Sequence, residues 1–163
     1  DYTQGAMRNA TKDNFRAVGS EAMSQGTRCR QLAEYVIFSS PLNMLCDSPS
    51  NYMNEPECTQ YIAQVPETWD ETVAIDGEVG KYVVIARRKA DTWYVGALTN
   101  WDARDLEIKL DFLADGEHSM TVFQDGVNAD KAARDYKKFS TALSGKTIKA
   151  HMAPGGGFVA IVK

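Results

Sequence analysis

The sequence has 163 residues, of which 44% are hydrophobic and 25% are charged, enough for one globular core or for a small domain with an appendage. Its formal net charge at pH 7 is −4, and it has no basic stripe that would neutralise phosphates or an anionic lipid surface, which disfavours nucleic-acid and membrane partners. No apolar run approaches the length of a membrane span.

Residues 1–65 and residues 66–163 differ in composition. The first segment holds all three cysteines and no tryptophan, whereas the second holds every tryptophan and most of the glycines. We therefore expect two structural parts, with a boundary near Pro66.

The first segment predicts two or three helices. Residues 26–45 carry an apolar stripe at helical spacing, formed by Cys29, Leu32, Tyr35, Val36, Ser39 and Leu45. This pattern predicts a mostly buried helix that is interrupted around Pro41. Arg28 and Arg30 on this helix are expected to form exposed ion pairs, which stabilise little. Pro56 suits the first turn of a second, short helix.

Beyond Pro66 the hydrophobic period becomes two, which is typical of half-buried strands. The clearest alternation is DLEIKLDFL, and further short strands are expected at KYVVIARR, TWYVGALTN, HSMTVFQ, KTIKAHM and GFVAIVK. The spacing predicts a mainly β fold, an antiparallel β-sandwich. The stretch NADKAARD predicts a short connecting helix with Asn128 as its N-cap. APGGGF predicts a flexible turn, because no helix follows it to form a phosphate cradle.

The strand over residues 93–101 carries two tryptophans and a tyrosine, which are either a platform for a sugar or part of the core. Trp93 and Tyr94 point to opposite faces, and neither face is clearly polar. We therefore expect the strand to be covered on both sides, with these two rings acting mainly in packing. Trp101, at the end of the strand, is expected to be partly exposed.

The chain has three cysteines, Cys29, Cys46 and Cys58, and a disulfide between Cys46 and Cys58 is one possible pairing. His118 and His151 are the only histidines and lie far along the chain, so the thiols have neither zinc-ligand spacing nor a nearby base. Buried or bridged structural cysteines are favoured over a reactive thiol.

Long stretches of the sequence resemble the C-terminal end of glycoside hydrolase family 97, which includes α-glucosidases and α-galactosidases of the Bacteroides type. They are DYTQGAMRNA, GTRCRQLAEYVIFSSPLNMLCDSPSNY, the run from VPETWDETVAID to LEIKLDFL, and GGGFVAIVK. The resemblance covers essentially the whole chain and rests on far more than a short motif.

The resemblance implies a parent enzyme with an N-terminal β-sandwich, a (β/α)8 catalytic barrel and a C-terminal all-β domain. Residues 1–65 would hold the last loop and helices of the barrel, and residues 66–163 the C-terminal sandwich. The family's catalytic glutamates, several of which hold a calcium ion, are expected upstream of Asp1. No catalytic or metal-binding residue is therefore assigned to this chain, and no pair of its carboxylates stands out as the acid and base that glycoside hydrolysis needs.

Two groups of residues are candidates for contacting the sugar. They are Asp1, Tyr2 and Thr3, and Trp69, Asp70 and Glu71. By resemblance, the first group follows the last barrel strand at the rim of the pocket, where it would either hydrogen-bond sugar hydroxyls or brace a loop. The second group lies where a linking loop could return toward the pocket, although a structural anchor between domains is favoured there.

The resemblance implies the C-terminal part of a calcium-dependent, exo-acting glycosidase, with an α-glucosidase on starch-derived oligosaccharides preferred and this chain itself structural. A non-catalytic carbohydrate-binding module is the alternative. The expected partners are the parent's oligosaccharide substrate and either the upstream barrel polypeptide or a second copy, because the apolar helix stripe needs a cover. The resemblance also implies a location in the periplasm or outer membrane of a Gram-negative bacterium.

Overall fold

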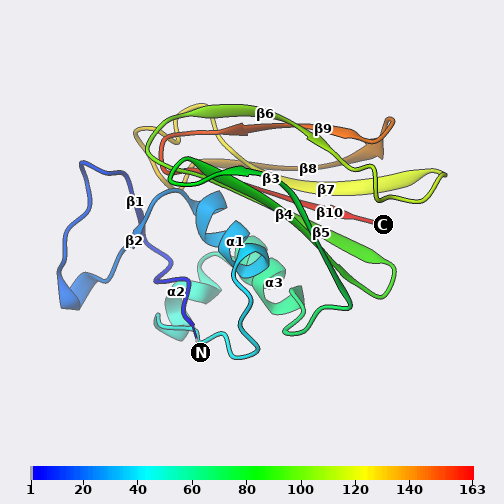
Figure 1. The fold of residues 1–163 in the computed structure, drawn as a ribbon. Helices are drawn as coiled ribbons and strands as arrows, with labels where there is room; N and C mark the ends of the chain where they lie inside the picture. The colour runs from blue at the N-terminus through cyan, green and yellow to red at the C-terminus, as the bar shows by residue number, and fades with distance from the viewer. Residues whose placement is uncertain (1) are drawn as a thin grey trace.

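The computed structural model describes residues 2–163, so the predictions made for Asp1 lie outside the described residues. Three layers are stacked in Figure 1, with helices beneath a large antiparallel sheet and a two-stranded ribbon above it. In chain order the elements are β1 (Asn9–Ala10), η1, a 3₁₀ turn (Gly19–Glu21), β2 (Ser24–Gln25), α1 (Arg28–Ile37), α2 (Pro49–Met53), α3 (Pro56–Gln64), β3 (Glu71–Glu78), β4 (Tyr82–Lys89), β5 (Thr92–Thr99), β6 (Arg104–Lys109), β7 (His118–Asp125), β8 (Tyr136–Leu143), β9 (Thr147–Met152) and β10 (Gly157–Val162).

The large sheet has the strand order β3-β4-β5-β10-β7-β8, and each neighbouring pair is antiparallel. Strands β6 and β9 pair separately and form the ribbon. The β4–β5 hairpin turns at Ala90 and Asp91, so that Lys89 pairs with Thr92. The predicted mainly β, antiparallel sandwich is confirmed.

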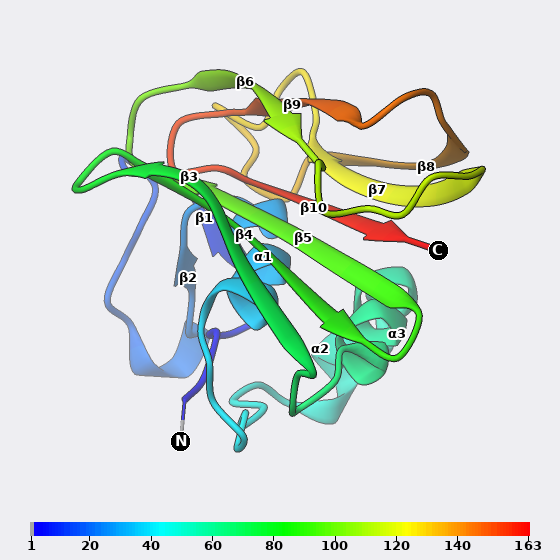
Figure 2. The same cartoon turned by 45° about the vertical axis from the view of Figure 1, so that its right-hand side comes forward.

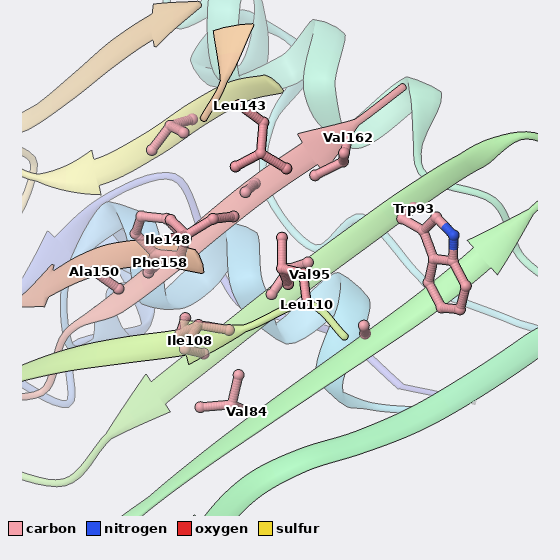
Figure 3. Close-up of a cluster of buried hydrophobic side chains, with 14 of the residues drawn as sticks. Val84, Trp93, Val95, Ile108, Leu110, Leu143, Ile148, Ala150, Phe158 and Val162 are labelled. Carbon is pink, nitrogen blue, oxygen red and sulfur yellow. The ribbon is translucent and has the colours of Figure 1, made fainter. Parts of the chain in front are cut away.

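The upper core fills the space between the ribbon and the sheet, as Figure 3 shows. It contains Val84, Trp93, Val95, Ile108, Leu110, Ile148, Phe158 and Val162. Trp93 is only 9% exposed, and its ring packs on Phe112 with 4.3 Å between ring centroids. The interpretation of Trp93 as a packing residue is therefore confirmed, and its buried ring is not free to stack on a sugar. Trp101 is partly exposed, as expected.

The lower core lies where α1 crosses the opposite face of the sheet, against β5 and β10, which both cartoon views show (Figure 2). Leu32 and Val36 are fully buried there, and side chains of this size contribute about 1.5–3 kcal/mol each when buried. Gly96 of β5 permits the close approach, because a Cβ at that position would lie 3.0 Å from the Cβ of Val36. The chain's own sandwich thus covers the apolar helix stripe.

Both ends of α1 are fixed by specific hydrogen bonds. The Thr27 side chain accepts from the backbone N–H of Arg30 at 3.1 Å and caps the N-terminus. Arg87 reaches across from β4 and donates to the carbonyl oxygens of Val36 and Ile37, at 2.6 and 3.2 Å. These donors satisfy carbonyls that a helix end leaves without partners and so stabilise the last turn of α1, which ends at Ile37.

Two parts of the helical prediction are wrong. The apolar stripe was expected to continue through Ser39 and Leu45, but both lie beyond α1, and the Leu45 side chain is 56% exposed. The stretch around Asn128 forms turns instead of a helix. There the Ala133 carbonyl accepts from the N–H of Arg28 at 2.7 Å, which ties this loop to the start of α1. The prediction of a helix beginning at Pro56 is confirmed.

Candidate functional site

The N-terminal candidates are held by the loop that follows α1. The backbone of Tyr2 donates to the Leu42 carbonyl at 3.0 Å and accepts from Met44 N–H at 2.8 Å. The Tyr2 ring packs on Phe38, with 4.8 Å between centroids, and burial raises the pKa of its phenol. Thr3 is exposed, and its hydroxyl accepts from Gly5 N–H. The loop-brace role accounts for these contacts of Tyr2.

The second group lies at the start of β3, and its side chains contact the β4–β5 hairpin. Trp69 meets Tyr94 edge to face at 5.3 Å. Asp70 accepts from the backbone N–H of Ala90 at 2.8 Å and from Lys89 Nζ at 3.2 Å, and these bonds lower the pKa of its carboxyl. Because Ala90 has a φ of +50°, the carboxylate of Asp70 stabilises a turn that is strained for a residue with a side chain.

Glu71 is likewise engaged in an ion pair. Its Oε2 accepts from Nε and Nη2 of Arg88 at 3.1 and 3.0 Å. Within residues 2–163, no hydrogen bond or ring contact joins this group to Tyr2 or Thr3. Contact of either group with a sugar stays a prediction.

Arg28 departs most from the sequence expectation. Its side chain is 0% exposed, so the expected exposed ion pair is wrong. Its Nε donates to Asn9 Oδ1, its Nη2 donates to the Met7 carbonyl, and its Nη1 lies 3.3 Å from Glu55. The guanidinium therefore joins the N-terminal segment to α1 and to the start of α3. The sequence did carry one signal for the burial of Arg28. It precedes Leu32 by four residues, so the two side chains lie on the same face of the helix.

Arg30 matches the expectation better. It pairs with Glu34 one helical turn later at 3.2 Å, and it also donates to the Thr99 carbonyl at 2.9 Å. Burial raises the pKa of Glu34 to about 7, against the opposing effect of Arg30. The contact with Thr99 attaches the helix to β5.

Three consecutive glycines, Gly155 to Gly157, lie at a crowded junction where the predicted turn leads into β10. Gly155 has a φ of +65°, and a Cβ there would overlap the ring of Trp101. A Cβ on Gly157 would lie 2.5 Å from the Cα of Arg30. Only glycine permits the backbone to approach both neighbours this closely.

Asp125 anchors the same turn and was not singled out from the sequence. It is 1% exposed, and its Oδ2 accepts from the backbone N–H groups of Ala153 and Gly157 at 2.9 and 3.2 Å. Burial raises the pKa of Asp125 to about 6, although the hydrogen bonds from Ala153 and Gly157 act in the opposite direction. A buried acid at the end of a half-polar strand has no distinctive sequence signal.

A cleft of about 650 Å³ lies between the N-terminal segment and α2, and its lining includes three acids, Glu21, Asp47 and Glu55. Asp47 accepts from Met7 N–H at 2.7 Å and from the Asn51 side chain at 2.7 Å. Burial opposes these bonds, but together they hold its pKa below the usual range. Glu55 is paired with Arg28. Asp47 and Glu55 thus serve as local braces, and Glu21 pairs with Arg8 at 2.7 Å.

The cysteines form no disulfide. All three thiols are free, with Cys29 and Cys58 buried and Cys46 exposed, so the structure does not bear out the Cys46–Cys58 bridge. Across residues 2–163 no group of three or more His, Cys, Asp or Glu side chains is placed to hold a metal ion. In the same residues, no helix has both the length and the apolarity to cross a membrane.

The sequence of this chain is similar to those of known proteins. A family model described as the C-terminal, oligomerisation domain of glycosyl hydrolase 97 matches residues 68–163. The chain is 59% identical over 165 residues to a retaining α-galactosidase of Bacteroides thetaiotaomicron, a match covering 100% of this chain and 25% of that enzyme. It is 26% identical over 161 residues to a probable retaining α-galactosidase of Streptomyces bingchenggensis, covering 99% of this chain and 23% of that protein. The chain spans about a quarter of the length of these relatives.

Solved structures agree with the sequence comparison. A glycoside hydrolase family 97 enzyme from Pseudoalteromonas sp. strain K8, in complex with panose, superposes with a TM-score of 0.80 at 34% identity, covering 85% of this chain and 22% of that one. A β-arabinopyranosidase gives a TM-score of 0.72 at 30% identity, covering 86% of this chain and 22% of that one. From the family model and the 59% identity together, we conclude that the chain belongs to glycoside hydrolase family 97 and contains the family's C-terminal domain.

Proposed function

We propose that this chain is the non-catalytic, self-associating C-terminal part of a retaining α-galactosidase. The observation that carries the proposal is the match of residues 68–163 to a family model described as an oligomerisation domain. The packing supports a structural role, because the aromatic and acidic candidates of β3 and β5 already contact other parts of the same chain.

The absence of catalysis is argued from the carboxylates. Glycoside hydrolysis needs one carboxyl group to protonate the leaving oxygen and a second to attack the anomeric carbon or activate water. Asp70 and Glu71 are bound to Lys89 and Arg88, and Asp125 is enclosed at the glycine turn. We therefore expect the acid and base on the rest of the parent polypeptide, together with the expected calcium ion.

The preference for galactosides follows from the relative that is 59% identical, and it replaces the preference for glucosides drawn from the sequence. Glucosides are a second candidate, favoured by the panose bound to the 34% identical enzyme, because panose is built from glucose units. Export to the periplasm or outer membrane is proposed from the family resemblance alone.

Hydrolysis assays test both parts of the proposal. The purified 163-residue chain should release no nitrophenol from nitrophenyl α-galactoside or α-glucoside, with or without added calcium. The full-length parent should cleave at least one of these two substrates, and its kcat/KM should be larger for the galactoside. Turnover by the isolated chain would contradict the non-catalytic role, and a larger kcat/KM for the glucoside would reverse the substrate assignment.

A further inference from the structure

We propose that two copies of this chain associate by antiparallel pairing of β8 with β8, which joins two six-stranded sheets into one. This inference rests on the proposed self-association and names the surface that carries it. Strand β8 is the last strand of the large sheet, beyond β7. It is regular over eight residues, pairs with β7 without a bulge and contains no proline.

The backbone of β8 presents alternate residues to the outside. Ser119 and Lys163 exchange both N–H···O bonds, so odd-numbered residues of β7 bond to β10 and even-numbered ones bond to β8. The bond from Gly126 N–H to the Asp135 carbonyl fits the same alternation. Odd-numbered residues of β8 are therefore the ones bonded to β7. Tyr136, Lys138, Ser140 and Ala142 direct their N–H and C=O groups away from the sheet.

An unpaired edge of this kind is a template for another strand unless it is blunted. The opposite edge, β3, is blunted, because its pairing with β4 is interrupted by a register shift between Ala74 and Asp76 and three of its eight residues are acidic. On β8, Lys138 is paired with Glu57 at 3.4 Å, and Lys137 is the other charged residue of the strand. The two edges are thus not equivalent, and β8 is the one open to pairing.

The exposed apolar side chains point to the same strand. Within residues 68–163, which match the oligomerisation model, the large exposed apolar residues are Val79, Val127 and Phe139. Val79 and Val127 lie in turns, and only Phe139, 43% exposed, lies in a strand. The ribbon covers the middle of the sheet and leaves this part of β8 bare, as its largely exposed residues show.

Two-fold symmetry requires one residue of β8 to lie opposite its own mate, and Phe139 is the residue that we place there. With Phe139 opposite its symmetry mate, the pair occupies a non-hydrogen-bonded site, where side chains approach most closely and aromatic pairs are favourable. Lys138 then lies opposite the partner's Ser140, and the two outward-facing residues exchange hydrogen bonds. A register centred on Lys138 would place two ammonium groups opposite each other.

Disulfide trapping tests this register directly. In the full 163-residue chain, Cys46→Ser removes the exposed thiol, and Phe139→Cys or Thr141→Cys is added. Opposed residues in a non-hydrogen-bonded pair have Cα atoms about 4.5 Å apart, within the range for a disulfide of about 4.4–6.8 Å. Mild oxidation should link F139C to its mate. T141C lies four residues from its own mate, roughly 13 Å away, and should stay unlinked.

A charge substitution provides the second measurement. Phe139→Glu places two carboxylates opposite each other and should raise the dimer dissociation constant, measured by sedimentation, by at least about tenfold. Val127→Glu adds the same charge at an exposed apolar residue away from the edge and should leave it unchanged, with equal melting temperatures showing that both variants fold.

The outcomes separate this inference from the proposed function. A dimer that survives F139E and gives no F139C cross-link excludes β8 as the interface but leaves self-association standing. A wild-type chain that is monomeric at every concentration rejects both.

Discussion

At the scale of single residues, the account depends on buried polar groups that hold neighbouring elements together. Asp125 fixes the turn before β10, and Arg28 ties the N-terminal segment to α1. Glycines occupy the points where these elements meet. The cost of changing such residues should therefore exceed that of similar changes on the surface.

Asp125 predicts a specific pH dependence. Its folded-state pKa of about 6 is above the value of 3.8 for an exposed aspartate, so between these pH values the folded chain binds a proton that the unfolded chain has released. Its contribution to stability therefore falls as pH rises from about 4 to about 6. In urea unfolding across this range, the free energy of unfolding should fall less steeply with rising pH for Asp125→Asn than for the wild type.

A control distinguishes this effect from any general charge effect. Lys146 lowers the pKa of exposed Asp115, so this carboxyl does not share the raised pKa of Asp125. Asp115→Asn should leave the slope between pH 4 and 6 unchanged. Equal slopes for the wild type and D125N would show that Asp125 is not the source of the pH dependence.

The glycine turn gives a second prediction. Gly157→Ala places a Cβ 2.5 Å from the Cα of Arg30, where only backbone can yield, and should lower the free energy of unfolding by about 1–3 kcal/mol or more. A Cβ added to Gly19 would meet no atom within 4 Å, so Gly19→Ala should change the free energy of unfolding by less than about 0.5 kcal/mol. Chemical denaturation measures both, and equal effects would contradict the packing argument.

At the scale of elements, α1 is held between the sheet and the N-terminal segment, and its C-terminal end depends on Arg87. That arginine donates to two carbonyl oxygens of the last turn. Arg87→Met should leave these buried acceptors unsatisfied and cost about 1–3 kcal/mol of unfolding free energy. The neighbouring Arg88 pairs with Glu71 near the surface, so Arg88→Met should cost no more than about 1 kcal/mol. A smaller loss for R87M than for R88M in urea unfolding would show that Arg87 does not secure the helix.

The central strands were predictable from the sequence, but the edge strands were not. Strands β4, β5 and β10 are rich in apolar residues because they are covered on both faces. Strand β8 is largely exposed on both faces, and β3 half-buries only Val73 and Ile75, so a period-two pattern is absent from β8 and too short to recognise in β3. The helix predicted near Asn128 failed for a similar reason, because hydrogen bonds to α1 and not local preference decide that loop.

At the scale of the whole molecule, family membership was recognisable from long stretches of sequence. The contacts that each candidate side chain makes were not. Asp70 and Glu71 have the chemistry of sugar-binding residues, and only the structure shows that they contact the β4–β5 hairpin. The division into residues 1–65 and 66–163 stays a prediction. The helices of the first part nevertheless pack on the sheet of the second.

The structural role of Asp70 can be checked in the full-length enzyme. Asp70→Ala removes the acceptor for the Ala90 N–H and should lower the melting temperature while leaving kcat and KM for the nitrophenyl glycoside unchanged. Asp91→Ala, in the same exposed turn, should affect neither. A rise in KM for D70A without a change in melting temperature would instead place Asp70 at the sugar.

The central claim is that this chain brings copies of its parent together, and its mass in solution tests that most directly. Sedimentation equilibrium of the purified wild-type chain, over a wide range of concentration, should give a mass approaching twice the 18.0 kDa of one chain. A constant mass of 18.0 kDa at every concentration would contradict the account.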